Sequence, residues 1–110
     1  MTRLGRRVQY CPLVGPDTPV YDTPDRGSEA PVVGTLRAGG LANWFVGQAE
    51  RSTFRRGEHE TRWWAFTLSD DRTWGWVPEV YFKGGVDTEP GAGLLACATR
   101  DNPCRETVGR

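Results

Sequence analysis

The stretch Arg62–Phe82 reads RWWAFTLSDDRTWGWVPEVYF and holds four of the five tryptophans of the chain. Two apolar, aromatic runs flank the polar break Ser69–Arg72, a pattern typical of two β-strands joined by a tight turn. Pro78 closes the second run because proline lacks the N–H group that a strand ladder requires. Tyr81 follows three residues later. The stretch therefore predicts aromatic faces and a proline gathered near one end of a small β-sheet, which favours binding over catalysis.

The rest of the chain favours short strands and frequent turns. Its 110 residues suit about one domain, and 14 glycines and 8 prolines argue against long helices. We expect a single 3₁₀ turn at 78–82. The polar segment 49–61 is expected to be the distal loop of a hairpin, unless the flanking strands extend into it. The five predicted strands are 20–23, 32–36, 43–48, 62–68 and 73–77.

The charge balance bears on the class of partner. The chain has 14 basic and 14 acidic residues, so its net charge gives no reason to expect nucleic acid or an anionic membrane as partner. No apolar run approaches the roughly 18–20 residues that span a bilayer. Met1–Arg7 carries positive charge without an apolar segment behind it, so a signal peptide is not expected. Either the protein is cytosolic, or the chain is a mature or trimmed segment.

Three cysteines leave the redox state open. A bridge from Cys11 to Cys97 would join the two tails across the domain and would contribute about 2–4 kcal/mol to stability. A bridge from Cys97 to Cys104 would close only a small loop, and one cysteine is left over in either case. The alternative is three unpaired thiols in a reducing compartment.

Residues that suggest catalysis or metal binding have simpler explanations. His59 lies in a charged, polar segment, and nothing in the sequence ties it to a cysteine, so it is expected to be a solvated side chain. Asp70 and Asp71 lie between two strands, where turn chemistry accounts for them better than acid–base catalysis. No cofactor or metal is expected, and the chain is not expected to be an enzyme.

The adjacent pair Trp63 and Trp64 must point to opposite faces of one strand. One ring is then expected in the core and the other at the surface, and we assign Trp63 the surface position because an exposed indole is a common recognition anchor. Trp74 and Trp76 are two residues apart and share a face, and Trp76 is expected to pack in the core.

Four segments in order resemble the bacterial SH3 (SH3b) family of SH3-like barrels. The opening VYDTP is followed by a variable loop, and the later segments are similar to the family patterns apolar-x-G-T-L-x-x-G, W-W/Y-x-V-x-L and G-W-V-x-x-x-Y. The resemblance covers 19–82, more than half of the chain. The matching segments are 20–24, 32–39, 62–68 and 75–81.

The end of this region is also similar to the G-W/F-x-P-x-x-Y end of eukaryotic SH3 domains, in which proline and tyrosine line a groove for polyproline peptides. Carried over residue by residue, the resemblance implies a groove with two polar rim residues, although Thr23 stands where that pattern has its second tyrosine. The groove residues would be Tyr21, Trp63, Pro78 and Tyr81, and the rim residues Asp22 and Glu79.

These observations together predict an all-β, small five-stranded SH3-like barrel at 19–83, with an N-terminal arm at 1–18 and a C-terminal tail at 84–110 that docks partly through 94–97. The resemblance implies non-catalytic recognition of a peptide, a peptidoglycan stem peptide or a protein partner, with 49–61 tuning specificity. It also implies an extracellular or cell-wall location, with a cytoplasmic one as the alternative. The alternative function is a structural or regulatory subunit that packs on a partner protein without a soluble ligand.

Overall fold

A computed structural model describes residues 2–3, 6–14, 17–37 and 43–82. The described part is built from strands and two 3₁₀ turns, and within it no helix has the length and apolar character needed to span a membrane. The elements are β1 (Thr2–Arg3), β2 (Arg6–Arg7), β3 (Gln9–Tyr10), β4 (Asp17–Tyr21), η1 (Gly27–Glu29), β5 (Val32–Arg37), β6 (Trp44–Phe45), β7 (Gly47–Arg56), β8 (His59–Leu68), β9 (Trp74–Pro78) and η2 (Glu79–Tyr81).

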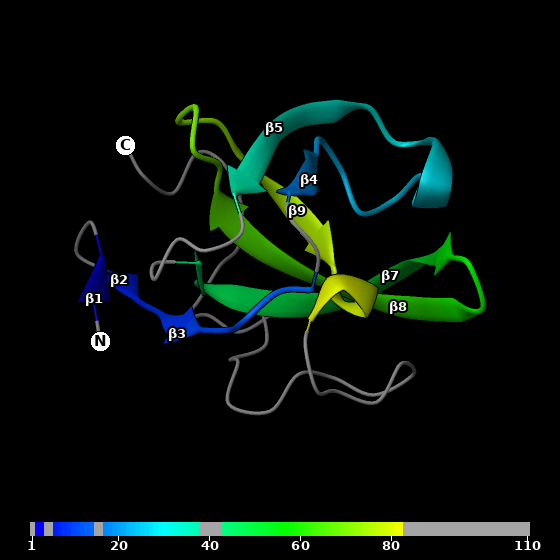
Figure 1. Cartoon of the computed structure of the whole chain (residues 1–110), viewed down its shortest axis with the longest axis horizontal. Coiled ribbons are helices and arrows are strands. Elements are labelled where there is room, and N and C mark those ends of the chain that lie inside the picture. The colour runs from blue at the N-terminus through cyan, green and yellow to red at the C-terminus, as the bar shows by residue number, and fades with distance from the viewer. Residues whose placement is uncertain (1, 4–5, 15–16, 38–42, 83–110) are drawn as a thin grey trace.

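One antiparallel sheet of five strands forms the body, in the order β5-β4-β9-β8-β7 (Figure 1). Two smaller ladders join β1 to β2 and β3 to β6. The all-β class is therefore confirmed, and each of the five predicted strands overlaps a strand of the main sheet. The strand predicted at 43–48 overlaps both β6 and the start of β7. The expected boundary at residue 19 falls inside β4, which begins at Asp17. The tail 84–110, with its docking segment 94–97, lies outside the described residues.

The main sheet is not closed into the expected barrel, because other segments cover its two edges. Along the β7 edge, the Ser52 N–H donates to the Pro24 carbonyl at 3.0 Å and the Arg55 N–H donates to the Ser28 hydroxyl at 3.2 Å. The loop between β4 and β5 thus takes the place of a closing strand. Covering an edge in this way satisfies its backbone groups and blocks unwanted strand pairing.

The turn between β8 and β9 covers part of the opposite edge, at β5. The Asp70 N–H donates to the Thr35 carbonyl, and the Arg37 N–H donates to the Asp70 carboxylate, both at 2.9 Å. Within this turn, the Ser69 hydroxyl donates to Asp71. The structure therefore confirms that Asp70 and Asp71 serve turn geometry.

Both faces of the sheet pack against apolar side chains. Neighbouring strand residues alternate between two clusters, as the period of a strand requires: Trp64 belongs to the first and Ala65 to the second, and Trp76 and Val77 divide in the same way. Trp76 is 6% exposed, which confirms its core position. The first cluster comprises Tyr21, Ala30, Val46, Phe54, Trp64, Phe66, Trp76 and Val80, and the second Val20, Leu36, Phe45, Ala65 and Val77.

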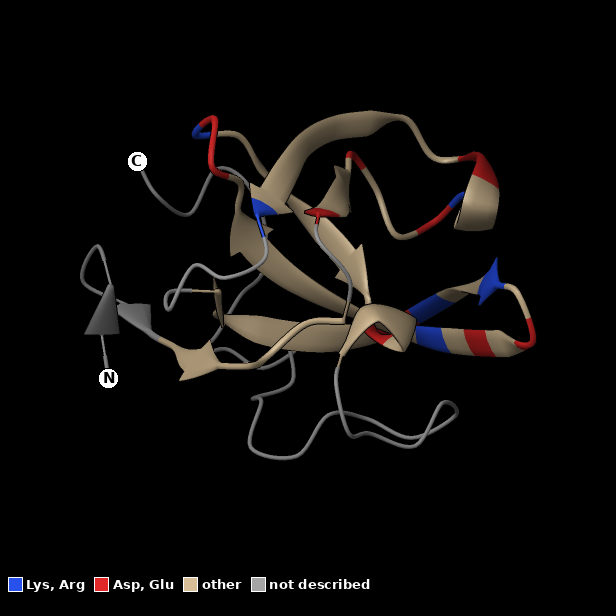
Figure 2. Ribbon diagram, in the orientation of Figure 1, with Lys and Arg blue, Asp and Glu red and all other residues tan. Residues whose placement is uncertain are grey.

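The segment 49–61 is mostly strand, so the interpretation with extended strands is the correct one. The β7–β8 ladder runs on to the pair Arg56↔His59, and only Gly57 and Glu58 separate the two strands. Gly57 has φ +63°, a conformation that glycine adopts without strain. The hairpin extends beyond the rest of the sheet in Figure 1 and carries charges of both signs near its end in Figure 2.

The covering loop depends on Gly27, which can be tested against Gly57. Gly27 has φ +56°, close to the value at Gly57, but a Cβ atom there would lie 2.5 Å from the Thr53 carbonyl oxygen, whereas a Cβ at Gly57 would meet nothing within 4 Å. Both alanine variants strain the backbone alike, so Gly27→Ala should cost about 2 kcal/mol more in free energy of unfolding than Gly57→Ala. Urea denaturation of the two variants measures this difference, and equal losses would contradict the close approach of loop and strand.

Candidate binding site

The six residues of the expected groove divide between the interior and the surface. Tyr21 is 8% exposed, and its ring packs edge-on against Phe54 at 5.3 Å and Trp64 at 5.9 Å between centroids. Pro78 is fully buried opposite Trp64 in the β8–β9 ladder. Tyr21 and Pro78 therefore support the site from the core and present almost no surface to a ligand.

Tyr81 links this core to the surface. Its half-buried ring lies 6.0 Å from that of Phe54, and the Arg56 guanidinium sits 5.0 Å from the centre of the Tyr81 ring. Such a cation–π contact holds the hairpin against η2. Burial raises the pKa of Tyr21 to about 12, and the electrostatic interaction and the side-chain hydrogen bond with Tyr81 act in the same direction. Tyr21 and Tyr81 are thus the two groove residues that the structure brings together.

The two expected rim residues differ in exposure. Asp22 is exposed directly after β4, whereas Glu79 is 8% exposed at the start of η2. The charge of Glu79 acts on Cys11, whose pKa rises to about 12, chiefly through burial of the thiol and secondly through this carboxylate. Glu79 therefore belongs to the interior beside the N-terminal arm. Cys11 has no disulfide partner among the described residues, and Cys97 lies outside them, so their bridge stays a prediction.

Trp63 lies apart from these groups. Its side chain is half-buried, belongs to neither hydrophobic cluster and stands opposite Glu50 in the β7–β8 ladder. Trp64, the next residue, is 0% exposed. The opposite orientation of the two indoles thus follows the expected alternation, and Trp63 is the one nearer the surface.

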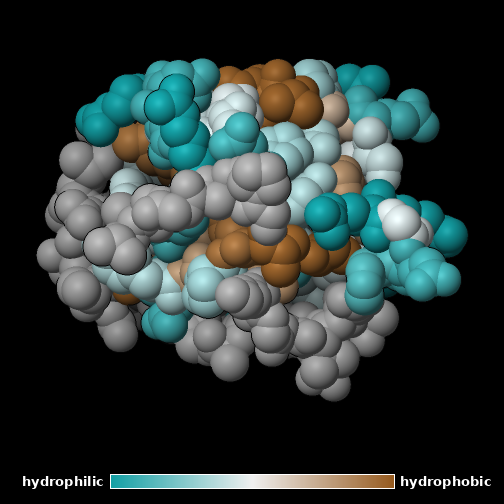
Figure 3. Space-filling model, in the orientation of Figure 1, coloured by the Kyte–Doolittle hydropathy of each residue, from teal (hydrophilic) through white to brown (hydrophobic). Residues whose placement is uncertain are grey.

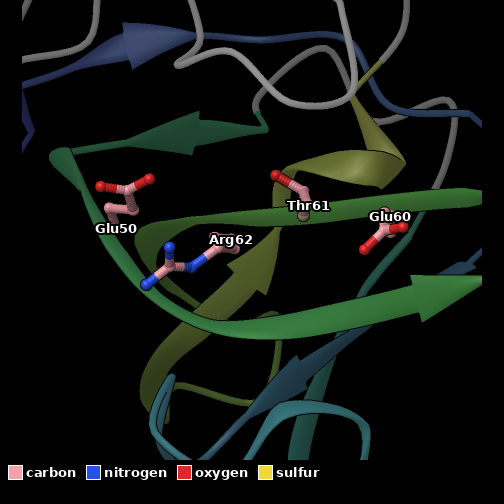
Figure 4. A pocket seen from close by; sticks show the side chains of 4 residues that line it. All are labelled: Glu50, Glu60, Thr61 and Arg62. Atoms are coloured by element: carbon pink, nitrogen blue, oxygen red, sulfur yellow. The ribbon is translucent and has the colours of Figure 1, made fainter.

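A hollow of about 220 Å³ opens on the hairpin (Figure 4). Trp63 follows its lining residue Arg62 in the chain and pairs with a second lining residue, Glu50, in the β7–β8 ladder. Beside the hollow the β7–β8 register shifts between Glu50 and Phe54, where the pairing of the two strands is irregular, as at a β-bulge. Thr61 at its base is 1% exposed, and the Thr61 hydroxyl accepts a hydrogen bond from the Trp63 N–H at 3.0 Å. The residues that line the hollow are Glu50, Glu60, Thr61 and Arg62.

Two of the charged side chains that line this hollow, Arg62 and Glu60, already interact with other groups of the protein. The Arg62 Nε donates to the Arg51 carbonyl at 3.2 Å, which fixes the guanidinium along the strand. Glu60 lies 3.9 Å from the Arg55 guanidinium, and because both side chains are largely exposed the pair contributes little energy. Glu50 forms no ion pair with any residue of the described part. The hollow therefore presents a carboxylate acceptor beside an indole.

Sequence reasoning identified Trp63 but did not single out the four lining residues. It assigned 49–61 to specificity without a mechanism, because a bulge leaves no clear mark in a polar sequence. The available signal was the alternation of charged Glu60 and Arg62 around uncharged Thr61, a pattern of a strand that the structure bears out by burying Thr61. Figure 3 shows that hydrophilic side chains gather on the hairpin beside an apolar patch.

A second hollow of about 300 Å³ is lined by Thr35, Arg37, Asp70 and Asp71. The Asp70 carboxylate already accepts the hydrogen bond from the Arg37 N–H that attaches the β8–β9 turn to β5, and the Asp71 carboxylate accepts from the Ser69 hydroxyl within the turn. This hollow is accordingly a by-product of edge covering, and we assign it no ligand.

Groups suited to catalysis or metal binding are scattered. His59 is exposed at the outer end of the hairpin, whereas Cys11 lies near Glu79. Among the residues that the structure describes, no three His, Cys, Asp or Glu side chains are placed to hold a metal ion.

Comparison with family models, curated proteins and solved structures finds no significant match to the chain. The fold and the site together define an all-β protein with a half-buried tryptophan, Trp63, on its hairpin. The resemblance to bacterial SH3 domains stays a prediction.

Proposed function

We propose that the chain is a non-catalytic binding module that recognises a peptide segment or protein partner at the hollow beside Trp63. One observation carries the proposal: half-buried Trp63 pairs in the β7–β8 ladder with Glu50, a carboxylate that lines an open hollow and has no ion-pair partner in the described part of the chain. Aromatic residues at the rim of a pocket are frequent anchors of protein recognition. The SH3b resemblance supports the same class of function.

The size of the hollow favours a peptide over a free small molecule. Its volume of about 220 Å³ lies below the roughly 300–1,000 Å³ of sites that enclose whole ligands. It suits one side chain of a longer partner, with the remaining contacts spread over the hairpin. Glu50 would accept a hydrogen bond from an amine or guanidinium of that side chain. Stem peptides of the cell wall and basic protein segments both supply such groups.

Titration with muropeptides and then a panel of basic and proline-rich peptides tests this proposal, with isothermal calorimetry as the readout. Trp63→Ala should weaken binding at least tenfold, which corresponds to about 1.4 kcal/mol, because it removes the anchor without opening the core. Val32→Ala is the matched control, since Val32 is 57% exposed on β5, the strand at the far edge of the sheet. An equal loss in both variants would contradict the assignment of the site.

Glu50→Gln separates charge from shape in the same titration. It keeps the outline of the hollow and removes the carboxylate charge, so an amine-bearing ligand should bind more weakly and with less dependence on salt. Binding that ignores this change would place the ligand elsewhere. A folded protein that binds no member of the panel would favour the structural or regulatory subunit instead.

A further inference from the structure

Within the N-terminal arm, residues 8–14 lie across the body as an extended segment that is held mainly through its backbone (Figure 1). The Cys11 N–H donates to the Asn43 carbonyl at 3.1 Å, and the Val14 N–H donates to the Tyr81 carbonyl at 2.9 Å. The remaining pairings are Gln9↔Phe45, Tyr10↔Trp44 and the bridge Leu13↔Phe82.

The surface under the arm has the two features of a strand-addition site. Backbone carbonyls of Asn43 and Tyr81 provide acceptors that any extended segment can use. Apolar side chains of the arm, those of Cys11 and Leu13, pack against the cluster that contains Phe45. Main-chain hydrogen bonds supply affinity in this mode of recognition, and pockets for alternate side chains supply specificity.

The arm is held less firmly than the strands of the main sheet. The β3–β6 ladder pairs only two residues on each strand, whereas β7 and β8 pair along most of their length. Pro12 is exposed and has no N–H to donate, and the side chains of Val8, Cys11, Leu13 and Val14 are only half-buried. Segments with short ladders and few buried contacts open locally at a lower free energy than the core.

We propose that the surface under the arm is a second binding site, which takes an extended apolar segment of a partner protein, and that residues 8–14 occupy it as a competitor within the same chain. The inference rests on the proposed function as a binding module but uses a different surface. The arm of a second copy would make the same contacts, but it lacks the tether that gives the chain's own arm an effective concentration of order mM. A second copy would therefore compete poorly with the chain's own arm. A partner segment with better side chains gains contacts that the arm lacks.

The test uses the full chain and a fluorescent synthetic peptide with the sequence of residues 8–14, followed by fluorescence anisotropy. Val14→Pro removes the N–H that the arm donates to Tyr81 and should raise the affinity for this probe at least tenfold, because the competing arm is weakened. Gln9→Ala is the matched control in the same arm, since Gln9 is exposed, and it should leave the affinity unchanged. A probe that carries the Val14→Pro change should bind weakly to every variant.

Four results would overturn the proposal. The first is a folded Val14→Pro chain that binds the probe no better than the unsubstituted chain, and the second is a Val14→Pro chain that no longer folds, which would make the arm part of the core. The third is a hydrogen-exchange measurement on the unsubstituted chain in which the amides of Cys11 and Val14 exchange as slowly as the amide of Trp64 in the core. A dimer that forms as the concentration rises would identify a second copy as the occupant and would likewise overturn it.

The same variants keep this inference separate from the proposed function. Trp63 lies on the hairpin and pairs with Glu50, whereas residues 9 and 10 pair with β6, so Trp63→Ala should leave probe affinity unchanged. Probe binding without any response to the peptide panel would support the arm site and reject the hollow. The reverse pattern would support the hollow and reject the arm site.

Discussion

Replacing Trp64 by alanine is expected to lower the free energy of unfolding by about 3–5 kcal/mol. Trp64 is 0% exposed and packs edge-on against Phe54 at 5.5 Å and Tyr21 at 5.9 Å. Its Nε1–H also donates to the Ser52 carbonyl at 2.7 Å, so truncation opens a cavity and removes a hydrogen bond. A small domain has a total stability of roughly 5–15 kcal/mol, and the variant should be near its unfolding threshold at room temperature.

Urea denaturation followed by circular dichroism measures this loss, with Trp63→Ala as the adjacent control. Trp63 is half-buried and outside both clusters, so its truncation should cost only about 1 kcal/mol. Trp64→Phe retains a large ring but cannot donate to Ser52, and it should fall between the two. Equal losses for Trp63→Ala and Trp64→Ala would show that the two indoles are not divided between core and surface.

Alkaline pH is expected to unfold the protein progressively between about pH 9 and pH 12. Burial first, and the Glu79 carboxylate second, raise the pKa of Cys11 from 9.0 to about 12, and burial raises the pKa of Tyr21 from 10.0 to about 12. Above pH 9 the unfolded chain loses these protons before the folded chain does, so ionisation favours unfolding. The stability that the two groups contribute is complete below pH 9 and declines until both have ionised in the folded state.

Urea midpoints measured at pH 8, 9, 10, 11 and 12 report this decline. For each proton that the folded state retains and the unfolded state has lost, the free energy of unfolding falls by at most about 1.4 kcal/mol per pH unit. The contribution of Cys11 is smaller because its thiol is partly exposed. Cys11→Ala should remove the part that begins near pH 9, and Tyr21→Phe the part that begins near pH 10. Midpoints that stay constant up to pH 11 in the unsubstituted chain would contradict the burial of both groups.

The periodic segments of the chain were predictable because their residues decide them locally. The strand expected at 32–36 lies within β5, and the 3₁₀ turn expected at 78–82 contains η2, since β-branched residues in the strand and the proline at position 78 act through local sterics. The extent of the hairpin was not predictable in the same way. Phe54 and Thr61 form a ladder pair near the base of the hairpin, and both side chains are buried. Their burial depends on η2 and the β4–β5 loop, which pack against β7 and β8 but are distant in sequence.

The candidate site was predictable only in part. Adjacent aromatic residues on a strand must diverge, so Trp63 could be assigned to the surface once Trp64 was placed in the core. The burial of Tyr21 and Glu79 could not be foreseen, because aromatic and acidic residues occur both inside and outside proteins. The hollow beside Trp63 depends on a bulge, and the sequence carries no clear signal of a bulge.

The all-β class, the positions of the main strands and the tight turn at 69–72 follow from the amino-acid sequence alone, because short apolar, aromatic runs and the turn residues between them act over a few neighbours. Two features are seen only in the folded molecule: loops cover the sheet edges in place of a closing strand, and residues 8–14 lie against Tyr81 and Phe82. These features depend on hydrogen bonds between segments far apart in the chain. Their formation follows from which backbone groups remain unsatisfied once the sheet has assembled, and no local pattern records that.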